Sequence, residues 1–462
     1  MRSPKIGLLP LYIALYDQAM PEARKDAEAF YEQIAGALRK RGLEVATAPT
    51  CRLAPEFAAA VKGFEDAGAD AIVTLHLAYS PSLESAAVLA GTPLPLIVLD
   101  TTPTYNFGAN VDPAEIMGNH GIHGVQDMCN LLIRNGKVFQ IEAGHWEKSD
   151  VLDRVAGWAK AAQLASAIQG ARVGLVGEAF KGMGDFAVPF DVMQSTIGIE
   201  TVLLDPKVLQ SFVPLEDDPE VAKEMADDLE AFVVEDLDMD VHRRSVRAGL
   251  AIRRWIEAER LTALTVNFLV VDDSGLPTMP FLEISKAMAR GIGYGGEGDV
   301  LTAGLVGALA SVYPQTSFTE MFCPDWEGGS VFMSHMGEMN LNLVDGKPLL
   351  TNKAFPWSNA GQPAVAAGCF KGGGAVLINL APGPDGTYTL LICPGEMLSV
   401  KKDRMKDTIR GWFKPAMPVA DFLAAYSCLG GTHHSAVVYG DVTEEIVRFG
   451  ELMGWEVAVL CE

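Results

Sequence analysis

The stretch Lys5-Ile6-Gly7-Leu8-Leu9 near the start of the chain is a short apolar run of the kind that forms a buried strand. It is followed by a predicted helix from Pro21 to Arg41, opened by its proline and closed by Gly42, whose apolar residues recur on one face: Ala27, Phe30, Ile34 and Leu38. Further predicted strands alternate with helical stretches, at Glu44 to Ala48, Ala71 to Leu75 and Leu96 to Asp100. This alternation is typical of a parallel sheet with crossover helices and predicts a first α/β domain.

A second alternating series follows a long helix-prone run from Ser149 to Ile168. Gly170 ends that run, Arg172 to Val176 forms the next predicted strand, and another strand is predicted from Leu264 to Val270. We therefore expect a domain boundary near residue 170 and a second α/β domain after it.

After about residue 320 the sequence becomes rich in Gly, Pro and β-branched residues. The runs Ala375 to Leu380 and Tyr388 to Cys393 flank the turn Pro382-Gly383-Pro384-Asp385-Gly386, which predicts a β-hairpin. A helix from Val442 to Met453 and a strand from Glu456 to Leu460 end the chain. The predicted domains are 1–170, 171–319 and 320–462, the last mainly β.

Composition narrows the class of protein. Of the 462 residues, 49% are hydrophobic and 21% are charged, as in an ordinary globular protein. No apolar run is long enough to cross a bilayer. The apolar start is too short for a signal peptide, so a cytoplasmic location is expected. The seven cysteines form no CxxC pair and predict no disulfide framework. A formal net charge of -23 disfavours nucleic acid and anionic membranes, so the expected partner is a small molecule.

Two adjacent imidazoles stand in the segment Gly430-Gly431-Thr432-His433-His434-Ser435. A flexible glycine turn lets backbone approach closely, which suits a metal ligand. Another glycine-rich turn, Gly293-Tyr294-Gly295-Gly296-Glu297-Gly298-Asp299, carries two carboxylates and lacks the Gly-Lys-Ser/Thr ending of a phosphate loop. Its plain alternative is that Asp299 caps the next helix while Glu297 is merely solvated.

A further carboxylate and imidazole occur in Thr316-Ser317-Phe318-Thr319-Glu320 and Ser334-His335-Met336-Gly337-Glu338. With the residues above they make a mixed oxygen and nitrogen donor set, suited to Mn²⁺, Co²⁺, Mg²⁺ or Zn²⁺. The cysteines show no spacing that would favour a thiolate site.

These segments together resemble the L-arabinose isomerase and L-fucose isomerase family, the arabinose enzymes in particular. The family's motifs Gly-Glu-Gly-Asp, Thr-Ser-Phe-x-Glu, Ser-His-Met-x-Glu and Gly-Gly-x-His-His occur here in the same order. Weaker likeness, at Leu75 to Pro81, at His123-Gly124 and at Gly144 to Trp146, extends it over nearly the whole chain. The resemblance implies two Rossmann-like α/β domains with parallel sheets followed by a mainly β domain.

The resemblance also implies a divalent cation, Mn²⁺ first among the candidates, held by Glu297, Glu320, His335 and His434, with His433 the alternative to His434. It implies a homo-oligomer, a trimer or hexamer, in which a neighbouring subunit completes each active site. One departure concerns the sugar: where arabinose isomerases carry a Gly-Ser-Gln-His-Leu-Tyr-like segment, this chain has Leu9 to Asp17, and a substrate-contacting Gln is missing.

The hypothesis from sequence is a metal-dependent aldose–ketose isomerase working through an enediol or enediolate, with Glu297 and Glu320 as the acid and base in an order that sequence leaves open. Alternatives are an isomerase of a modified or acidic sugar such as sulfoquinovose, a non-catalytic sugar-binding protein of the same fold, and a metal-dependent hydrolase or aldolase. Further candidates for contacting substrate are His120, His123, Gln126, Lys181, Arg290 and His433.

Overall fold

The computed structural model describes residues 2–358 and 360–461, which divide into two compact units, Met1–Ser166 and Ala167–Glu462. The predicted three-domain division at residues 170 and 320 stays a prediction. Among the described residues, no helix combines the length and the apolar character needed to cross a bilayer.

The first unit is built on a five-stranded parallel sheet of order β2-β1-β3-β4-β5. Side chains of the helices over residues 54–66 and 122–134 pack against the sheet through Phe57, Val61, Val125 and Met128. The strands are β1 (Lys5–Leu11), β2 (Glu44–Thr47), β3 (Ala71–His76), β4 (Leu96–Asp100) and β5 (Gln140–Ala143).

The helices of this unit confirm the predicted alternation. The predicted helix at Pro21 is α2, which begins two residues later, at Ala23. The helices are α1 (Ala14–Ala19), α2 (Ala23–Arg39), α3 (Ala54–Asp66), α4 (Ser82–Gly91), η1 (Pro113–Glu115), α5 (Ile116–Asn119) and α6 (Ile122–Arg134), and α7 (Val151–Gln169) runs on into the second unit.

The second unit contains a four-stranded parallel sheet of order β10-β9-β6-β7. The strands are β6 (Arg172–Val176), β7 (Glu200–Leu203), β9 (Ala263–Val266) and β10 (Gly293–Gly296). Its helices are α8 (Phe190–Thr196), α9 (Pro206–Phe212), α10 (Pro219–Ala231), α11 (Met239–Glu259), α12 (Val271–Ser274), α13 (Phe281–Ala289) and α14 (Val300–Val312).

The strand predicted from Leu264 to Val270 is wrong in its second half. Strand β9 ends at Val266, and Phe268–Val270 forms a short 3-10 turn, η2. The side chain of Asn267 accepts a hydrogen bond from Leu269 N at 3.0 Å, and this local bond competes with strand pairing.

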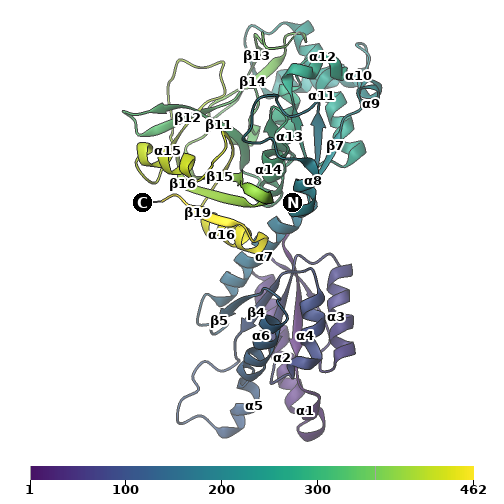
Figure 1. Ribbon diagram of the computed structural model, residues 1–462, viewed down its shortest axis with the longest axis vertical. Coiled ribbons are helices and arrows are strands. Elements are labelled where there is room, and N and C mark those ends of the chain that lie inside the picture. Colours follow the sequence, from purple (N-terminus) through teal and green to yellow (C-terminus); the bar gives the residue numbers. More distant parts are fainter. Residues whose placement is uncertain (1, 359, 462) are drawn as a thin grey trace. The chain divides into compact units, whose positions relative to one another are not determined.

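The last part of the second unit is an antiparallel barrel, shown in green and yellow in Figure 1. Six strands pair in the order β15-β18-β11-β12-β17-β16, and β16 pairs again with β15, which closes the ring. They are β11 (Thr316–Asp325), β12 (Ser330–Ser334), β15 (Gly373–Pro382), β16 (Tyr388–Met397), β17 (Gly411–Pro415) and β18 (His434–Tyr439). The predicted hairpin is β15–β16, whose ten residue pairs run from Gly373↔Met397 to Pro382↔Tyr388.

Smaller elements complete this unit. Strand β19 (Glu456–Val459) pairs in parallel with β16, and the helices α15 (Val419–Cys428) and α16 (Thr443–Met453) accompany the barrel. A separate mixed sheet joins β8 (Val233–Val234), β13 (Leu349–Asn352) and β14 (Ala364–Ala367). The fold class is therefore α/β with two parallel sheets, a small mixed sheet and a C-terminal antiparallel β-barrel.

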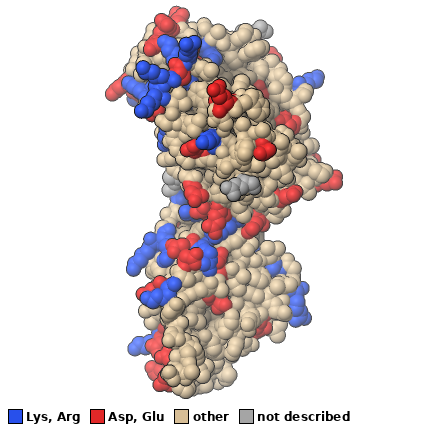
Figure 2. Space-filling view, turned by 90° about the vertical axis from the view of Figure 1, so that its left-hand side faces the viewer, with Lys and Arg blue, Asp and Glu red and all other residues tan. Residues whose placement is uncertain are grey.

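The acidic balance of the chain does not appear as a single charged patch on the face drawn in Figure 2. Lys and Arg side chains there lie beside Asp and Glu side chains. Ion pairs such as Arg52–Glu56 and Lys62–Asp66 also join opposite charges within the first unit.

Candidate metal centre

The register of the barrel strands brings Glu320 and two imidazoles together. On β11, Glu320 is paired directly with His434 of β18 on one side and with Ser334 of β12 on the other. Directly paired residues of antiparallel strands point to the same face of the sheet. His335 follows Ser334 just beyond the end of β12, and its Nε2 lies 3.9 Å from Oε2 of Glu320, so His335 joins the pair at this end of the strands.

A glycine-rich turn between β10 and α14 supplies Glu297. Its φ of 61° lies in the left-handed region, which costs a non-glycine residue energy and is often retained where a side chain has a functional role. Its carbonyl oxygen accepts a hydrogen bond from Phe180 N at 2.9 Å, and Asp299 caps α14 by accepting from Thr302 N at 2.9 Å. The turn is thereby fixed at both ends.

Gly296 leaves the space in which the imidazoles converge. A Cβ atom at this position would lie 2.8 Å from Nε2 of His335 and 3.2 Å from Nε2 of His434. Only glycine therefore allows both ring nitrogens to reach this point without displacement.

Two overlapping groups in this region have ligand atoms within 4.8 Å of one another: Glu297, His433 and His434, and Glu320, His335 and His434. Nε2 of His434 lies 3.8 Å from Oε2 of Glu297, and Nε2 of His335 lies 3.9 Å from Oε2 of Glu320. Ligand atoms about 2.0–2.2 Å from one ion are separated by roughly 3–4.4 Å, so a cation fits such spacings after a small contraction.

The burial of His434 also favours a metal ion at this site. His434 is fully buried, and its Nε2 has no hydrogen-bond partner among the described residues. An unpartnered buried nitrogen is costly unless a ligand satisfies it. The donor set, two carboxylates and two or three imidazoles, matches borderline and hard divalent cations.

Each of the three imidazoles has a carboxylate at its other ring nitrogen. Nδ1 of His434 lies 3.0 Å from Oδ2 of Asp299, and Nδ1 of His433 lies 2.6 Å from Oδ2 of Asp185. Nδ1 of His335 lies 3.0 Å from Oε1 of Glu338, close enough for an ion pair but without hydrogen-bond alignment. Carboxylates in this position fix the orientation of a metal-binding histidine and raise its basicity.

The rings of Phe186 and Phe318 pack against the imidazoles. Phe186 stacks on His434 with ring centroids 5.2 Å apart and an interplanar angle of 14°. Phe318 meets both His335 and His434 edge-on, at 4.8 and 5.1 Å. The imidazole planes are therefore restrained by packing as well as by hydrogen bonds.

The ionisable groups of the site shift one another's pKa values. Burial raises the pKa of Glu320, and the nearby imidazoles of His335 and His434 oppose that shift only in part. Burial lowers the pKa of His335, but the carboxylates of Glu338, Glu320 and Glu297 outweigh it, so the net shift is upward. The shift of Glu320 comes mainly from burial and that of His335 from the surrounding carboxylates, and a bound divalent cation would favour the ionised carboxylates and the neutral imidazole.

The Asp185–His433 pair at the edge of the cluster is shifted more strongly. Burial opposes the ionised form of Asp185, but hydrogen bonds from His433 dominate and lower its pKa to about 2. Burial likewise disfavours charged His433, yet Asp185 and Glu297 raise its pKa to about 10. His433 therefore carries a proton at neutral pH when no cation is present.

The other candidates from sequence are not members of these two ligand groups. His120, His123 and Gln126 belong to the first unit: Nε2 of His120 is 2.9 Å from the hydroxyl of Tyr16, while His123 and Gln126 are exposed on α6. Lys181 is exposed on the loop after β6, next to Phe180. Arg290 forms an ion pair with Glu283, which also binds Arg253.

Sequence reasoning missed Asp185 and gave no role to Glu338. Asp185 lies on the loop of residues 177–189 that follows β6, and ligands in α/β sheets gather at the carboxyl ends of the strands. Polar residues after the strand from Arg172 to Val176 could therefore have been singled out. Glu338 is the last residue of the Ser-His-Met-x-Glu motif, three residues after His335.

Comparison with known proteins matches two domain models. Residues 220–313 match the L-arabinose isomerase central domain, and residues 315–456 match the L-arabinose isomerase C-terminal domain. The second match contains Glu320, His335, His433 and His434, and the first contains Glu297.

Whole-chain comparison finds L-arabinose isomerases of several bacteria. That of Geobacillus kaustophilus (strain HTA426) is 26% identical over 359 residues, 74% of this chain and 71% of the relative. That of Thermotoga petrophila is 26% identical over 419 residues, 86% of this chain and 83% of the relative. Among solved structures, the comparison finds a periplasmic solute binding protein from Actinobacillus succinogenes 130z with bound D-allose. The match covers 67% of this chain and 91% of that one, at 12% identity. Its TM-score of 0.17 is too low to carry an argument. By its central and C-terminal domains, the chain belongs to the L-arabinose isomerase family.

Proposed function

We propose that the protein is a divalent-metal-dependent aldose–ketose isomerase. The observation that carries this proposal is the meeting of two carboxylates, Glu297 and Glu320, with an oriented set of imidazoles that includes one buried, unpartnered nitrogen. Aldose–ketose interconversion moves one proton between C1 and C2 and another between O1 and O2, so it needs two groups able to accept and donate protons.

Glu297, Glu320, His335 and His434 would hold the cation, for which Mn²⁺ is the first choice. When bound, the cation would supply electrophilic stabilisation of the negative charge that develops on adjacent sugar oxygens. The carboxylates of Glu297 and Glu320 stand on different elements, the β10–α14 turn and β11, and so can reach a sugar from two directions. One would take the proton from carbon while the other exchanges the proton of the oxygens, giving an enediol that collapses to either sugar.

Asp299, Glu338 and Asp185 would act by holding imidazoles in place. Phe186 and Phe318 exclude water from the buried side of the cluster through their ring contacts with His434. A dry, fixed environment strengthens the interactions of a cation with developing charge.

L-Arabinose and L-fucose are the first substrates to test, with acidic or modified sugars such as sulfoquinovose as alternatives. The missing Gln in Leu9 to Asp17 favours testing the wider set. The family resemblance also supports a homo-oligomer with shared active sites, in which a dissociated monomer would be inactive.

The decisive experiment is a panel of aldoses and ketoses incubated with full-length, metal-stripped protein, with and without Mn²⁺. Isomerised product, together with deuterium taken up at carbon in D₂O, is expected only with Mn²⁺. Absence of both, with Mn²⁺ demonstrably bound, would leave a sugar-binding protein instead. Cleavage products would point to a hydrolase or aldolase.

A further inference from the structure

Strand β10 carries a single side chain, that of Tyr294, among glycines. Successive residues of a strand point to opposite faces, so Tyr294 shares a face with Gly296. A Cβ atom at Gly296 would lie 2.8 Å from Nε2 of His335 and 3.2 Å from Nε2 of His434. The side chain of Tyr294 is therefore directed to the same side of the strand as the candidate metal centre.

The ring of Tyr294 is buried against Phe318. Tyr294 is 1% exposed, and the two rings meet edge-on with centroids 5.2 Å apart and an interplanar angle of 89°. Phe318 also meets His335 edge-on, at 4.8 Å. Tyr294 and His335 thus pack on the same aromatic ring, which restrains the position of the tyrosine hydroxyl.

The hydroxyl of Tyr294 hydrogen-bonds the carboxylate of Glu338. Glu338 is also 1% exposed, its Oε2 accepts from Gly337 N at 2.6 Å, and its Oε1 lies 3.0 Å from Nδ1 of His335. Within the described part of the chain, no Lys or Arg side chain forms an ion pair with Glu338. Because a buried carboxylate without such a partner depends on each hydrogen bond that it receives, the bond from Tyr294 helps to hold it in place.

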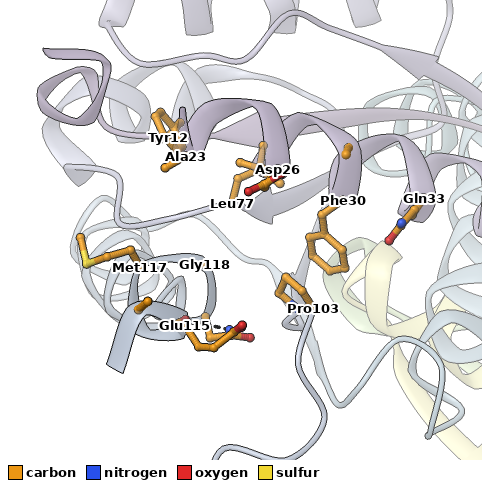
Figure 3. Close-up of a pocket in the computed structure, with 14 residues that line it drawn as sticks. Tyr12, Ala23, Asp26, Phe30, Gln33, Leu77, Pro103, Glu115, Met117 and Gly118 are labelled. Carbon is orange, nitrogen blue, oxygen red and sulfur yellow. Dashed lines mark hydrogen bonds between the residues drawn. The ribbon is translucent and has the colours of Figure 1, made fainter. Parts of the chain in front are cut away.

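Tyr294 differs from other tyrosines whose hydroxyl groups are buried. The hydroxyls of Tyr31 and Tyr426 donate to backbone carbonyl oxygens, at 2.8 and 2.7 Å. Those of Tyr313 and of Tyr12, which lines a cavity of the first unit (Figure 3), have no hydrogen-bond partner among the described residues. The partner of Tyr294, by contrast, is a carboxylate that itself contacts a candidate metal ligand.

We propose that Tyr294 is a positioning residue of the metal centre. Its hydroxyl donates to Glu338 and holds this carboxylate against Nδ1 of His335. A carboxylate in that position keeps the imidazole hydrogen on Nδ1, which leaves the lone pair of Nε2 free for a cation. The inference rests on the proposed function in one respect, that a divalent cation binds at the candidate metal centre.

The test is Tyr294→Phe, which removes one oxygen atom and keeps the ring that packs on Phe318. Titration of full-length, metal-stripped protein with Mn²⁺ in a calorimeter should show about 3- to 10-fold weaker binding, because one hydrogen bond to the carboxylate is lost. The visible absorption bands of bound Co²⁺, which report the geometry of its ligands, should shift. A hydroxyl that served folding alone would lower the melting temperature and leave Mn²⁺ affinity and Co²⁺ bands unchanged, a result that overturns the proposal.

Tyr313→Phe is the matched control. The hydroxyl of Tyr313 is buried in the same unit and has no partner among the residues that the structure describes. Its removal should leave both the Mn²⁺ affinity and the Co²⁺ bands as in the wild type. Thermal melts of the two variants verify that each one folds.

Glu338→Gln shows whether Tyr294 acts through Glu338. An amide has one acceptor oxygen, for which Tyr294 and His335 would compete, so the chain of hydrogen bonds is already broken in this variant. Adding Tyr294→Phe should then lower the Mn²⁺ affinity by less than about twofold. An equal loss of affinity in both backgrounds would mean that Tyr294 acts by another route, and it overturns the proposal.

Failure of the proposed function gives a different result. A wild-type protein that binds no Mn²⁺ refutes the metal centre and both proposals. A wild-type protein that binds Mn²⁺, loses affinity on Tyr294→Phe and isomerises no sugar supports the role of Tyr294 and refutes the isomerase alone.

Discussion

Asp299 and His434 join the parallel sheet to the barrel: Oδ2 of Asp299 lies 3.0 Å from Nδ1 of His434, while its Oδ1 caps α14. One carboxylate therefore serves a helix terminus with one oxygen and a candidate metal ligand with the other. The cap predicted for Asp299 from sequence is confirmed, whereas the solvated position considered for Glu297 is wrong, because Glu297 is buried.

Asp299→Asn separates these two roles. Asn caps helices about as well as Asp, so the melting temperature of the metal-free protein should change little. Loss of the negative charge beside His434 should weaken Mn²⁺ binding by about 10- to 100-fold. Calorimetric titration of Mn²⁺ measures this, and wild-type affinity in the variant would show that Asp299 is a cap alone.

Gly296→Ala tests the space between the imidazoles. The added Cβ would lie 2.8 Å from Nε2 of His335, so the ring must move and Mn²⁺ affinity should fall at least about tenfold. The control is Gly63→Ala on α3, where a Cβ meets nothing within 4 Å. That substitution should stabilise the protein by up to about 1 kcal/mol and leave Mn²⁺ binding unchanged.

Glu297→Gln and Glu320→Gln should each lower kcat by about 10²–10⁴-fold, because the amide keeps the size of the side chain but cannot accept the transferred proton. His335→Ala should act mainly on metal affinity and be partly rescued by excess Mn²⁺. The measurement is C–H exchange into D₂O alongside kcat and metal content. Wild-type exchange in both glutamine variants with Mn²⁺ bound would refute their acid/base role.

Removal of the cation should lower thermal stability. An ion that binds only the folded protein stabilises it by about 2.7 kcal/mol at a concentration 100 times its Kd. Chelation should therefore lower the melting temperature by several degrees and abolish activity, and Mn²⁺ or Co²⁺ should restore both. Identical melting curves with and without Mn²⁺ would argue against the site.

The Asp185–His433 pair predicts a pH dependence of stability in the metal-free protein. The pKa of Asp185 is lowered to about 2, so its contribution is present above its ordinary value of 3.8 and is lost as the pH falls through 2. The pKa of His433 is raised to about 10, so its contribution is complete below 6.5 and is lost as the pH rises through 10.

Asp185→Asn should therefore destabilise the metal-free protein most between about pH 4 and 6.5, with a difference that shrinks toward pH 10. Chemical denaturation of both proteins across this range measures it. A pH-independent difference would mean that the contact between these residues is not an ion pair.

Much of the fold could be predicted because apolar periodicity is a local signal. The apolar runs that begin at Lys5 and Ala71 form buried strands, as predicted. The helix over residues 23–39 buries Phe30, Ile34 and Leu38 of the face predicted for it. The strand proposed to Val270 failed because the hydrogen bond made by the Asn267 side chain is invisible to apolar periodicity.

Only part of the candidate metal centre could be predicted from the sequence. Glu320 and His434 stand in motifs, but their direct pairing depends on the register of β11 and β18, which are more than 100 residues apart. Asp185 reaches His433 from a loop 248 residues earlier in the chain, and a lone aspartate in a glycine-rich loop carries no local mark of that contact.

Closure of the barrel has a consequence for amide hydrogen exchange. Glu320 and His434 lie on neighbouring strands of a ring without a free edge there, so their amides should exchange only when the barrel opens as a whole. The loop of residues 177–189 has no such ladder and should open locally, at far lower cost. We therefore expect slow exchange for the backbone amides of Glu320 and His434 on one side of the metal centre. The amides of Asp185 and Phe186 on the other side should exchange fast.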